Sequence, residues 1–210
     1  MLTVKGIIIR VVDYKEKDRL LTIAALDKGL ICVNAKGARG EKAKLKGYVN
    51  LLTFGDFHLT QAKTGYILRG VDCKESFFNL WTDTAKYSAG ILCIELFEKT
   101  AREQDDINSE ITLLLNALKD INYGNNYALL YALKFMAITM SDLGIEYKEI
   151  TKYDVDIYEL INKLVKNNAN IDDIAYSENN VKKGIQLLNL LLKNAVNINL
   201  RVIPQILKTI

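Results

Sequence analysis

Residues 20–35 read LLTIAALDKGLICVNA. Two segments rich in strand-forming residues, 20–26 and 30–35, flank Asp27-Lys28-Gly29, which is typical of a β-hairpin turn. Segments of similar composition lie on both sides of this hairpin, at residues 4–12, 51–60 and 66–73. Gly55 falls within the alternation of residues 51–60, so we expect a bulge there. The amino-terminal part is therefore predicted to contain five strands.

Five short strands with no helix between them predict a small closed or nearly closed barrel, because closure removes exposed sheet edges. Among such folds, the five-stranded OB barrel is the commonest that carries a basic face and loops for single strands. We therefore expect an OB fold over residues 1–78. The strand count alone is also compatible with an SH3-like barrel.

The apolar pattern changes to a helical period at about Thr82. The stripes and their capping signals are residues 85–97 behind Thr82 or Asp83, residues 111–121 behind Asn108 or Ser109, and residues 126–143 before Gly144. Further stripes follow at residues 157–165 and 181–195. The fold class is therefore predicted to be α+β, with an all-α domain at residues 79–210 after the barrel.

Two details of the carboxyl-terminal half are also predicted. Pro204 is expected either to kink a last helix or to lie in its first turn. Asp172 and Asp173 lie in a polar, Asn-rich segment, and we interpret them as surface residues with no catalytic role.

Positive charge is concentrated in the first part of the chain. Residues 1–80 carry 14 Lys and Arg against 8 Asp and Glu, whereas residues 81–210 carry 14 against 17. Five cations lie among glycines in one segment: Lys36, Arg39, Lys42, Lys44 and Lys46. Glycine allows close approach, and each cation can displace a counterion from a phosphate. A solvated loop is the alternative, but the charge asymmetry favours contact with a polyanion.

Signals for catalysis and cofactors are missing. His58 is the only histidine, and from this we expect no Ser-His-Asp, Cys-His or His-rich metal arrangement within one chain. Residues 37–47 lack the Gly-Lys-Ser/Thr ending of a P-loop. The three cysteines, Cys32, Cys73 and Cys93, are widely spaced and are predicted to be small buried hydrophobes. We therefore expect a protein that is not an enzyme and has no cofactor.

No apolar run approaches the roughly 20 residues that span a bilayer. Lys5 and Arg10 also interrupt the apolar run at residues 4–12, which argues against a secretory signal. The sequence therefore predicts a cytoplasmic protein with no membrane partner.

The first part of the chain contains a recognisable set of residues: YKEKDRLLT at residues 14–22, Gly29, AKGAR at residues 35–39, Lys42, Leu45 and Gly47. This set resembles the amino-terminal signature of the RecO family of bacterial recombination mediators. The resemblance is strong over residues 4–60 and weaker afterwards, where Phe77-Phe78, Glu95-Leu96 and Leu143-Gly144 fit the helical half of the family.

This resemblance implies a nucleoid-associated protein with an OB-fold domain and a helical domain, which binds single- and double-stranded DNA and anneals complementary strands. It also implies action with RecR, and often RecF, to load RecA onto DNA coated with single-stranded-DNA-binding protein, whose acidic C-terminal tail is a further expected partner. Many family members carry a four-cysteine zinc site after the long helix. Residues 145–210 contain no Cys and no His, so we expect no such metal here.

The residues predicted to bind DNA come from the basic segment and its neighbours. Lys36 and Arg39 match the family motif, and Lys42, Lys44 and Lys46 extend the charge, so these five are the expected phosphate contacts. Lys17, Arg19 and Tyr48 are further candidates. Arg19 can instead pair with a carboxylate and fix the loop between the first two strands.

Tyr14, Tyr48 and Tyr66 are candidate platforms for stacking unpaired bases, with core packing or an ordinary surface position as the alternative. Two other functions fit the same residues. These are an RNA-binding OB protein and a non-catalytic scaffold that binds proteins.

Overall fold

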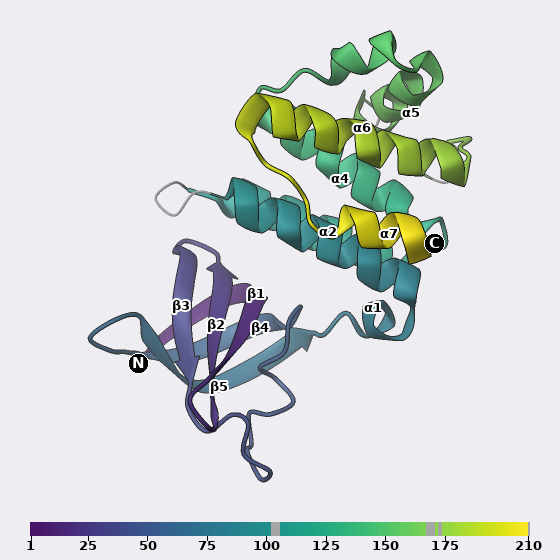
Figure 1. Ribbon diagram of the computed structural model, residues 1–210. Coiled ribbons are helices and arrows are strands. Elements are labelled where there is room, and N and C mark those ends of the chain that lie inside the picture. Colours follow the sequence, from purple (N-terminus) through teal and green to yellow (C-terminus); the bar gives the residue numbers. More distant parts are fainter. Residues whose placement is uncertain (102–105, 167–170, 172–173, 210) are drawn as a thin grey trace. The chain divides into compact units, whose positions relative to one another are not determined.

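The computed structural model describes residues 1–101, 106–166, 171 and 174–209 (Figure 1). Asp172 and Asp173, predicted to lie at the surface, are outside these residues. The chain divides into two compact units. The barrel unit consists of Met1–Phe77 and Ala101–Thr112, and the helical unit consists of Phe78–Thr100 and Leu113–Ile210.

The barrel unit contains the five predicted strands. They are β1 (Leu2–Tyr14), β2 (Asp18–Ala25), β3 (Gly29–Ala35), β4 (Phe54–Gln61) and β5 (Tyr66–Glu75). They close in the order β1-β2-β3-β5-β4, with β3 and β5 parallel and the other neighbours antiparallel. Alternate residues such as Leu21, Ile23 and Phe57 fill the interior. The predicted OB barrel is confirmed.

Backbone geometry explains the turn and the bulge that the sequence indicates. Asp27 and Gly29 both have positive φ, at 62° and 70°, as a tight hairpin turn requires. The β4–β5 register shifts between Phe54 and Gly55, so the predicted bulge is confirmed. A Cβ atom at Gly55 would lie 2.3 Å from the carbonyl oxygen of Asp72. The fourth strand was expected to begin at residue 51, but Leu52 has φ of 70° and the strand begins at Phe54.

The connection between β3 and β4, residues 36–53, forms successive turns and contains no helix or strand. Its amide groups donate to the carbonyl three residues earlier, from Gly40 to Gly37 at 3.0 Å and from Ala43 to Gly40 at 3.1 Å. Ala38 and Val49 are buried against the barrel core. The basic segment is therefore anchored near both ends, and Figure 1 shows it projecting from one end of the barrel.

The helical unit is built around one buried helix. Its helices are α1 (Phe78–Thr82), α2 (Thr84–Thr100), α4 (Ala128–Asp142), η1 (Tyr147–Lys152), α5 (Val155–Lys166), α6 (Glu178–Val196) and α7 (Ile203–Thr209). A further helix, α3 (Asn108–Tyr123), begins in the barrel unit and ends in the helical unit. Most residues of α4 are buried, so its methionines pack in the core. No helix in the described part of the chain is long and apolar enough to cross a bilayer.

Most of the predicted helix ends are confirmed. Asp83 caps α2 by accepting from the amides of Ala85 and Lys86, and Gly144, with φ of 73°, follows the end of α4. Pro204 lies in the first turn of α7. The cap predicted at Asn108 or Ser109 is wrong, because α3 already begins at Asn108.

Glu95 on α2 holds the segment that leads into α7. Its two carboxylate oxygens accept from the amides of Arg201 at 2.8 Å and Val202 at 3.0 Å. Lys99 pairs with the same carboxylate at 2.8 Å and also donates to the carbonyl of Asn199. Burial acts to raise the pKa of Glu95, but these hydrogen bonds and the Lys99 charge outweigh it and lower the pKa.

We predict that Glu95→Gln lowers the free energy of unfolding by about 1 kcal/mol at neutral pH, because the variant has no charged acceptor at this partly exposed position. Since the folded pKa is lowered, this contribution is present above the unfolded pKa and disappears as the pH falls through the folded pKa. Urea unfolding at several pH values measures the difference. Glu159→Gln, which changes an exposed carboxylate of α5, is the matched control. An equal effect of both variants would contradict the assigned role.

Candidate nucleic-acid interface

The predicted lysines form an exposed set on two neighbouring connections of the barrel unit. Lys17 lies in the turn between β1 and β2, and the others, Lys36, Lys42, Lys44 and Lys46, lie in the connection of residues 36–53. Within the described residues none of these ammonium groups has an ion-pair partner. The surface therefore presents five ammonium groups with which no carboxylate of the described residues pairs directly.

Arg19, in contrast, is bound on several sides. Its Nε lies 3.3 Å from Asp13 Oδ1, and its Nη1 donates to the carbonyl of Val49 at 3.2 Å and to Asn50 Oδ1 at 3.1 Å. Pairing with a carboxylate, the alternative raised from sequence, is confirmed. The ion pair joins the two strands that flank the β1–β2 turn, as that alternative supposed, and Arg19 also fixes the end of the β3–β4 connection.

Arg39, in the β3–β4 connection, also fixes the loop between β1 and β2. Its Nε lies 3.4 Å from the other oxygen of Asp13, and its Nη1 donates to the carbonyls of Lys15 and Glu16 at 3.4 and 3.3 Å. Its own amide donates to the carbonyl of Lys17 at 2.9 Å. Asp13 therefore lies between two guanidinium groups that belong to different segments.

The three candidate tyrosines differ in position. Tyr14 is exposed, and the ammonium of Lys15 lies 5.2 Å from its ring centroid. Tyr48 is 45% exposed in the β3–β4 connection. Tyr66 packs against the barrel core, so its role is core packing and not base stacking. Tyr14 and Tyr48 remain accessible to a base.

The outer face of β1, β2 and β3 supplies residues that the sequence reasoning missed. Register places them in two cross-strand rows, Arg10-Thr22-Cys32 and Val12-Leu20-Asn34. Val12 is 46% exposed although it is apolar. In OB folds, this part of the barrel and the loop between the first two strands bind oligonucleotides. The strand alternation in the sequence was the signal that could have identified this face.

The cysteine prediction is wrong for two positions. Cys32 and Cys73 are exposed on the barrel unit, and only Cys93 is buried, where burial raises the pKa of its thiol. No group of three or more His, Cys, Asp or Glu side chains within the described ranges is arranged to hold a metal ion. The residues present do not fit the four-cysteine zinc site of many RecO proteins.

The expectation that a single histidine precludes a hydroxyl–imidazole–carboxylate arrangement is also wrong. His58 Nδ1 lies 3.0 Å from Thr3 Oγ1, and its Nε2 lies 3.0 Å from Asp72 Oδ2. One imidazole has two nitrogens, so one histidine is enough. The three side chains link β1, β4 and β5 on the outside of the barrel.

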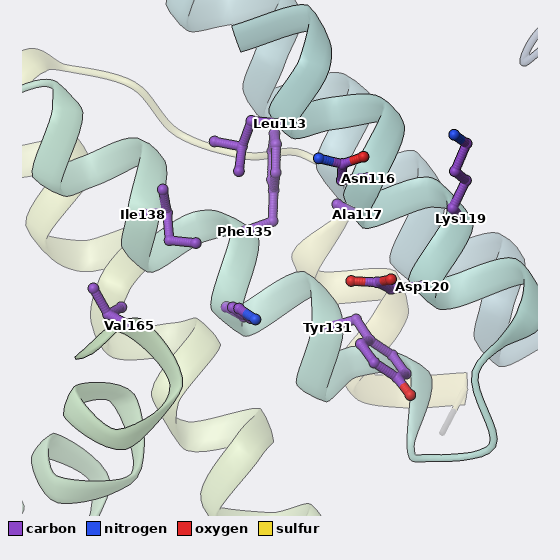
Figure 2. Close-up of a pocket in the computed structure, with 10 residues that line it drawn as sticks. Leu113, Asn116, Ala117, Lys119, Asp120, Tyr131, Phe135, Ile138 and Val165 are labelled. Carbon is purple, nitrogen blue, oxygen red and sulfur yellow. The ribbon is translucent and has the colours of Figure 1, made fainter. Parts of the chain in front are cut away.

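The helical unit contains a pocket of about 620 Å³ between residues of α3, α4 and α5 (Figure 2). Its apolar lining includes Leu113, Phe135, Ile138 and Val165, and its polar lining includes Asn116, Lys119, Asp120, Tyr131 and Lys134. Burial raises the pKa of Asp120, and the nearby Lys134 charge acts in the opposite direction. In Figure 2 Asp120 points into the pocket and Lys119 points away from it.

The fold and the basic surface define an OB-fold protein with an exposed electropositive connection. Residues 1–77 match the family described as "Recombination protein O N terminal". Proteins named "DNA repair protein RecO" are similar to the chain. The one from Acetivibrio thermocellus is 31% identical over 117 residues, which are 56% of this chain and 47% of that protein.

Two further relatives carry the same name. The protein of Clostridium perfringens is 34% identical over 48% of this chain and 41% of its own length. The protein of Dehalococcoides mccartyi is 29% identical over 65% of this chain and 53% of its own length. These matches place residues 1–77 in the family of RecO amino-terminal domains. The chain spans about half the length of the curated relatives it matches.

Proposed function

We propose that this DNA-repair protein of the RecO family binds single- and double-stranded DNA without sequence preference, through the barrel unit. The observation that carries the proposal is the set of exposed lysines without carboxylate partners on two adjacent connections. Phosphate contacts of this kind fix a strand in place and carry no sequence information. The proposed interface comprises Lys17, Lys36, Lys42, Lys44, Lys46 and Tyr48, with Arg19 and Arg39 beside them.

The outer face of β1, β2 and β3 supports the binding of unpaired bases. It adjoins the β1–β2 turn and presents Val12 and Tyr14 next to polar groups. Apolar and aromatic side chains tolerate every base, because every base has a flat face that can stack. A single strand would therefore lie with its phosphates toward the lysines and its bases toward this face.

Strand annealing follows from charge neutralisation and needs no catalytic acid or base. A protein that reduces the repulsion between two phosphate backbones, and leaves base edges free, increases the rate at which complementary strands meet. We propose this non-enzymatic role, together with help in loading RecA onto coated DNA in concert with RecR and RecF. RecA, RecR and RecF are inferred as partners from the resemblance to the RecO family. The positive charge of the barrel unit is compatible with a role on DNA beside them.

The pocket of the helical unit is the proposed site for the C-terminal tail of single-stranded-DNA-binding protein. An acidic tail that ends in an aromatic residue needs an apolar cavity with a nearby cation. Phe135, Ile138 and Val165 supply apolar walls, and Lys134 supplies the cation. Attachment through a second site raises the local concentration of the barrel unit on coated DNA.

The first test removes the charge of the lysine set. A variant with Met at Lys36, Lys42, Lys44 and Lys46 should bind a labelled single strand more weakly. The logarithmic slope of its salt dependence should fall by up to about 0.7 for each phosphate that the variant no longer binds. Fluorescence anisotropy at several salt concentrations measures both. The control changes four exposed lysines of the helical unit, Lys148, Lys163, Lys183 and Lys193, and keeps the net charge equal to that of the test variant.

An unchanged slope in the folded test variant would overturn the assigned phosphate-binding residues. Negligible affinity of the unaltered protein at physiological salt would instead favour the scaffold function. Stronger binding to a matched RNA strand in direct competition would favour an RNA-binding protein.

The second test concerns the pocket. Lys134→Met should slow annealing of strands coated with single-stranded-DNA-binding protein by about tenfold, the effect expected when one charge-assisted hydrogen bond is removed. Annealing of naked strands should not change, because the barrel unit is intact. Fluorescence quenching between complementary labelled strands follows both rates, and Lys163→Met on α5 is the control. Equal effects on coated and naked strands would contradict a tail-binding role.

A further inference from the structure

Asp13 occupies an unusual position beside the basic surface. Its carboxylate lies between the guanidinium groups of Arg19 and Arg39, at 3.3 and 3.4 Å. Asp13 pairs with Arg19 across β1 and β2, whereas Arg39 belongs to the β3–β4 connection. One carboxylate thus joins two cations from segments that are distant in sequence.

Each arginine also donates hydrogen bonds to backbone carbonyls of another segment. Arg19 donates to the carbonyl of Val49 and to the side chain of Asn50, near the end of the β3–β4 connection. Arg39 donates to the carbonyls of Lys15 and Glu16, in the turn between β1 and β2. A guanidinium has five donors in a fixed plane, so it can bind a carboxylate and carbonyls together.

A second carboxylate, that of Asp18, also joins the β3–β4 connection to the β1–β2 hairpin. Asp18, at the start of β2, accepts from the amide of Gly37 at 2.8 Å. The two connections are therefore joined at several points near Asp13, and the segment between Gly40 and Lys46 projects beyond them. The lysines of this segment have no comparable partners in the described structure.

We propose that Asp13 is a positioning residue, which uses Arg19 and Arg39 to hold the β1–β2 turn and the β3–β4 connection in one arrangement while the lysines alone contact phosphates. The inference rests on the proposed DNA-binding function and divides the basic residues into two roles. It adds Lys15, in the same turn as Lys17, to the phosphate-contacting set.

Holding these connections in place matters because they lack regular secondary structure. Ordering a chain segment costs about 1–2 kcal/mol for each residue, and a ligand that must order the segment loses that free energy from its affinity. The Asp13 arrangement supplies the order before DNA arrives. The acid therefore promotes the binding of a polyanion although its own charge repels it.

Loss of the Asp13 carboxylate should change DNA affinity in the direction opposite to that expected from its charge alone. Asp13→Asn and Glu16→Gln each remove one negative charge from the same region, but only Asp13 joins the arginines. Asp13→Asn should weaken single-strand binding about three- to tenfold with an unchanged salt slope, whereas Glu16→Gln should leave affinity equal or slightly higher. If Asp13→Asn strengthens binding as much as Glu16→Gln does, the arginines contact phosphate directly and the proposal is overturned.

A second variant and a measurement without DNA separate this proposal from the function on which it rests. Arg39→Lys keeps the charge but cannot reach the carboxylate and two carbonyls together, so it should reproduce the loss of affinity at the same slope. In the DNA-free protein, hydrogen exchange of residues 36–47 should be faster in Asp13→Asn and Arg39→Lys than in Glu16→Gln. Unchanged exchange would overturn the positioning role even if the protein binds DNA, and faster exchange would support it even if DNA binding fails.

Discussion

Strand β1 closes the barrel because it pairs with two neighbours. Its first residues pair with β4 and its later residues pair with β2, and the two sets overlap at Gly6 and Ile7. A Cβ atom at Gly6 would lie 2.5 Å from the carbonyl oxygen of Ala24, so the strand approaches its neighbour there as only glycine allows. The chain passes from β3 to β4 through the connection of residues 36–53, and the basic segment lies in that connection.

The barrel determines which charges remain available. Arg19 and Arg39 bind carbonyls and Asp13, while the lysines of the connection form no ion pair among the described residues. A protein that meets DNA of any sequence needs such uncommitted cations more than it needs a shaped pocket. The pocket of the helical unit differs, since it has apolar walls and a polar lining that includes Lys119, Asp120 and Lys134. We therefore propose two kinds of site, one in each unit and each built from its own residues.

Local signals made much of the fold predictable. The hairpin at Asp27-Lys28-Gly29, the bulge at Gly55, and the helix ends at Asp83 and Gly144 each depend on a few adjacent residues, and all were confirmed. Strand alternation likewise gave the barrel core. Predictions that depend on distant residues were less successful. The exposure of Cys32 and Cys73 and the Thr3–His58–Asp72 link depend on which strands become neighbours.

The candidate site shows the same division. The sequence identifies the cations of residues 36–46 but does not distinguish a lysine with no partner from an arginine that holds two loops. That difference depends on contacts such as Arg19 with Val49, which are 30 residues apart. The outer face of β1, β2 and β3 was missed because its apolar residues, such as Val12 and Leu20, alternate with core residues of the same kind. The alternation in the sequence separates the two faces of each strand, and the register shows which residues of the outer face are neighbours.

Hydrogen exchange of the whole chain, with and without a saturating single-stranded oligonucleotide, would show whether the barrel unit binds DNA. We expect slower exchange at residues 10–22 and 36–47 when DNA is bound, with protection that weakens as salt is raised. Protection confined to the helical unit, or none in the barrel unit at low salt, would contradict it.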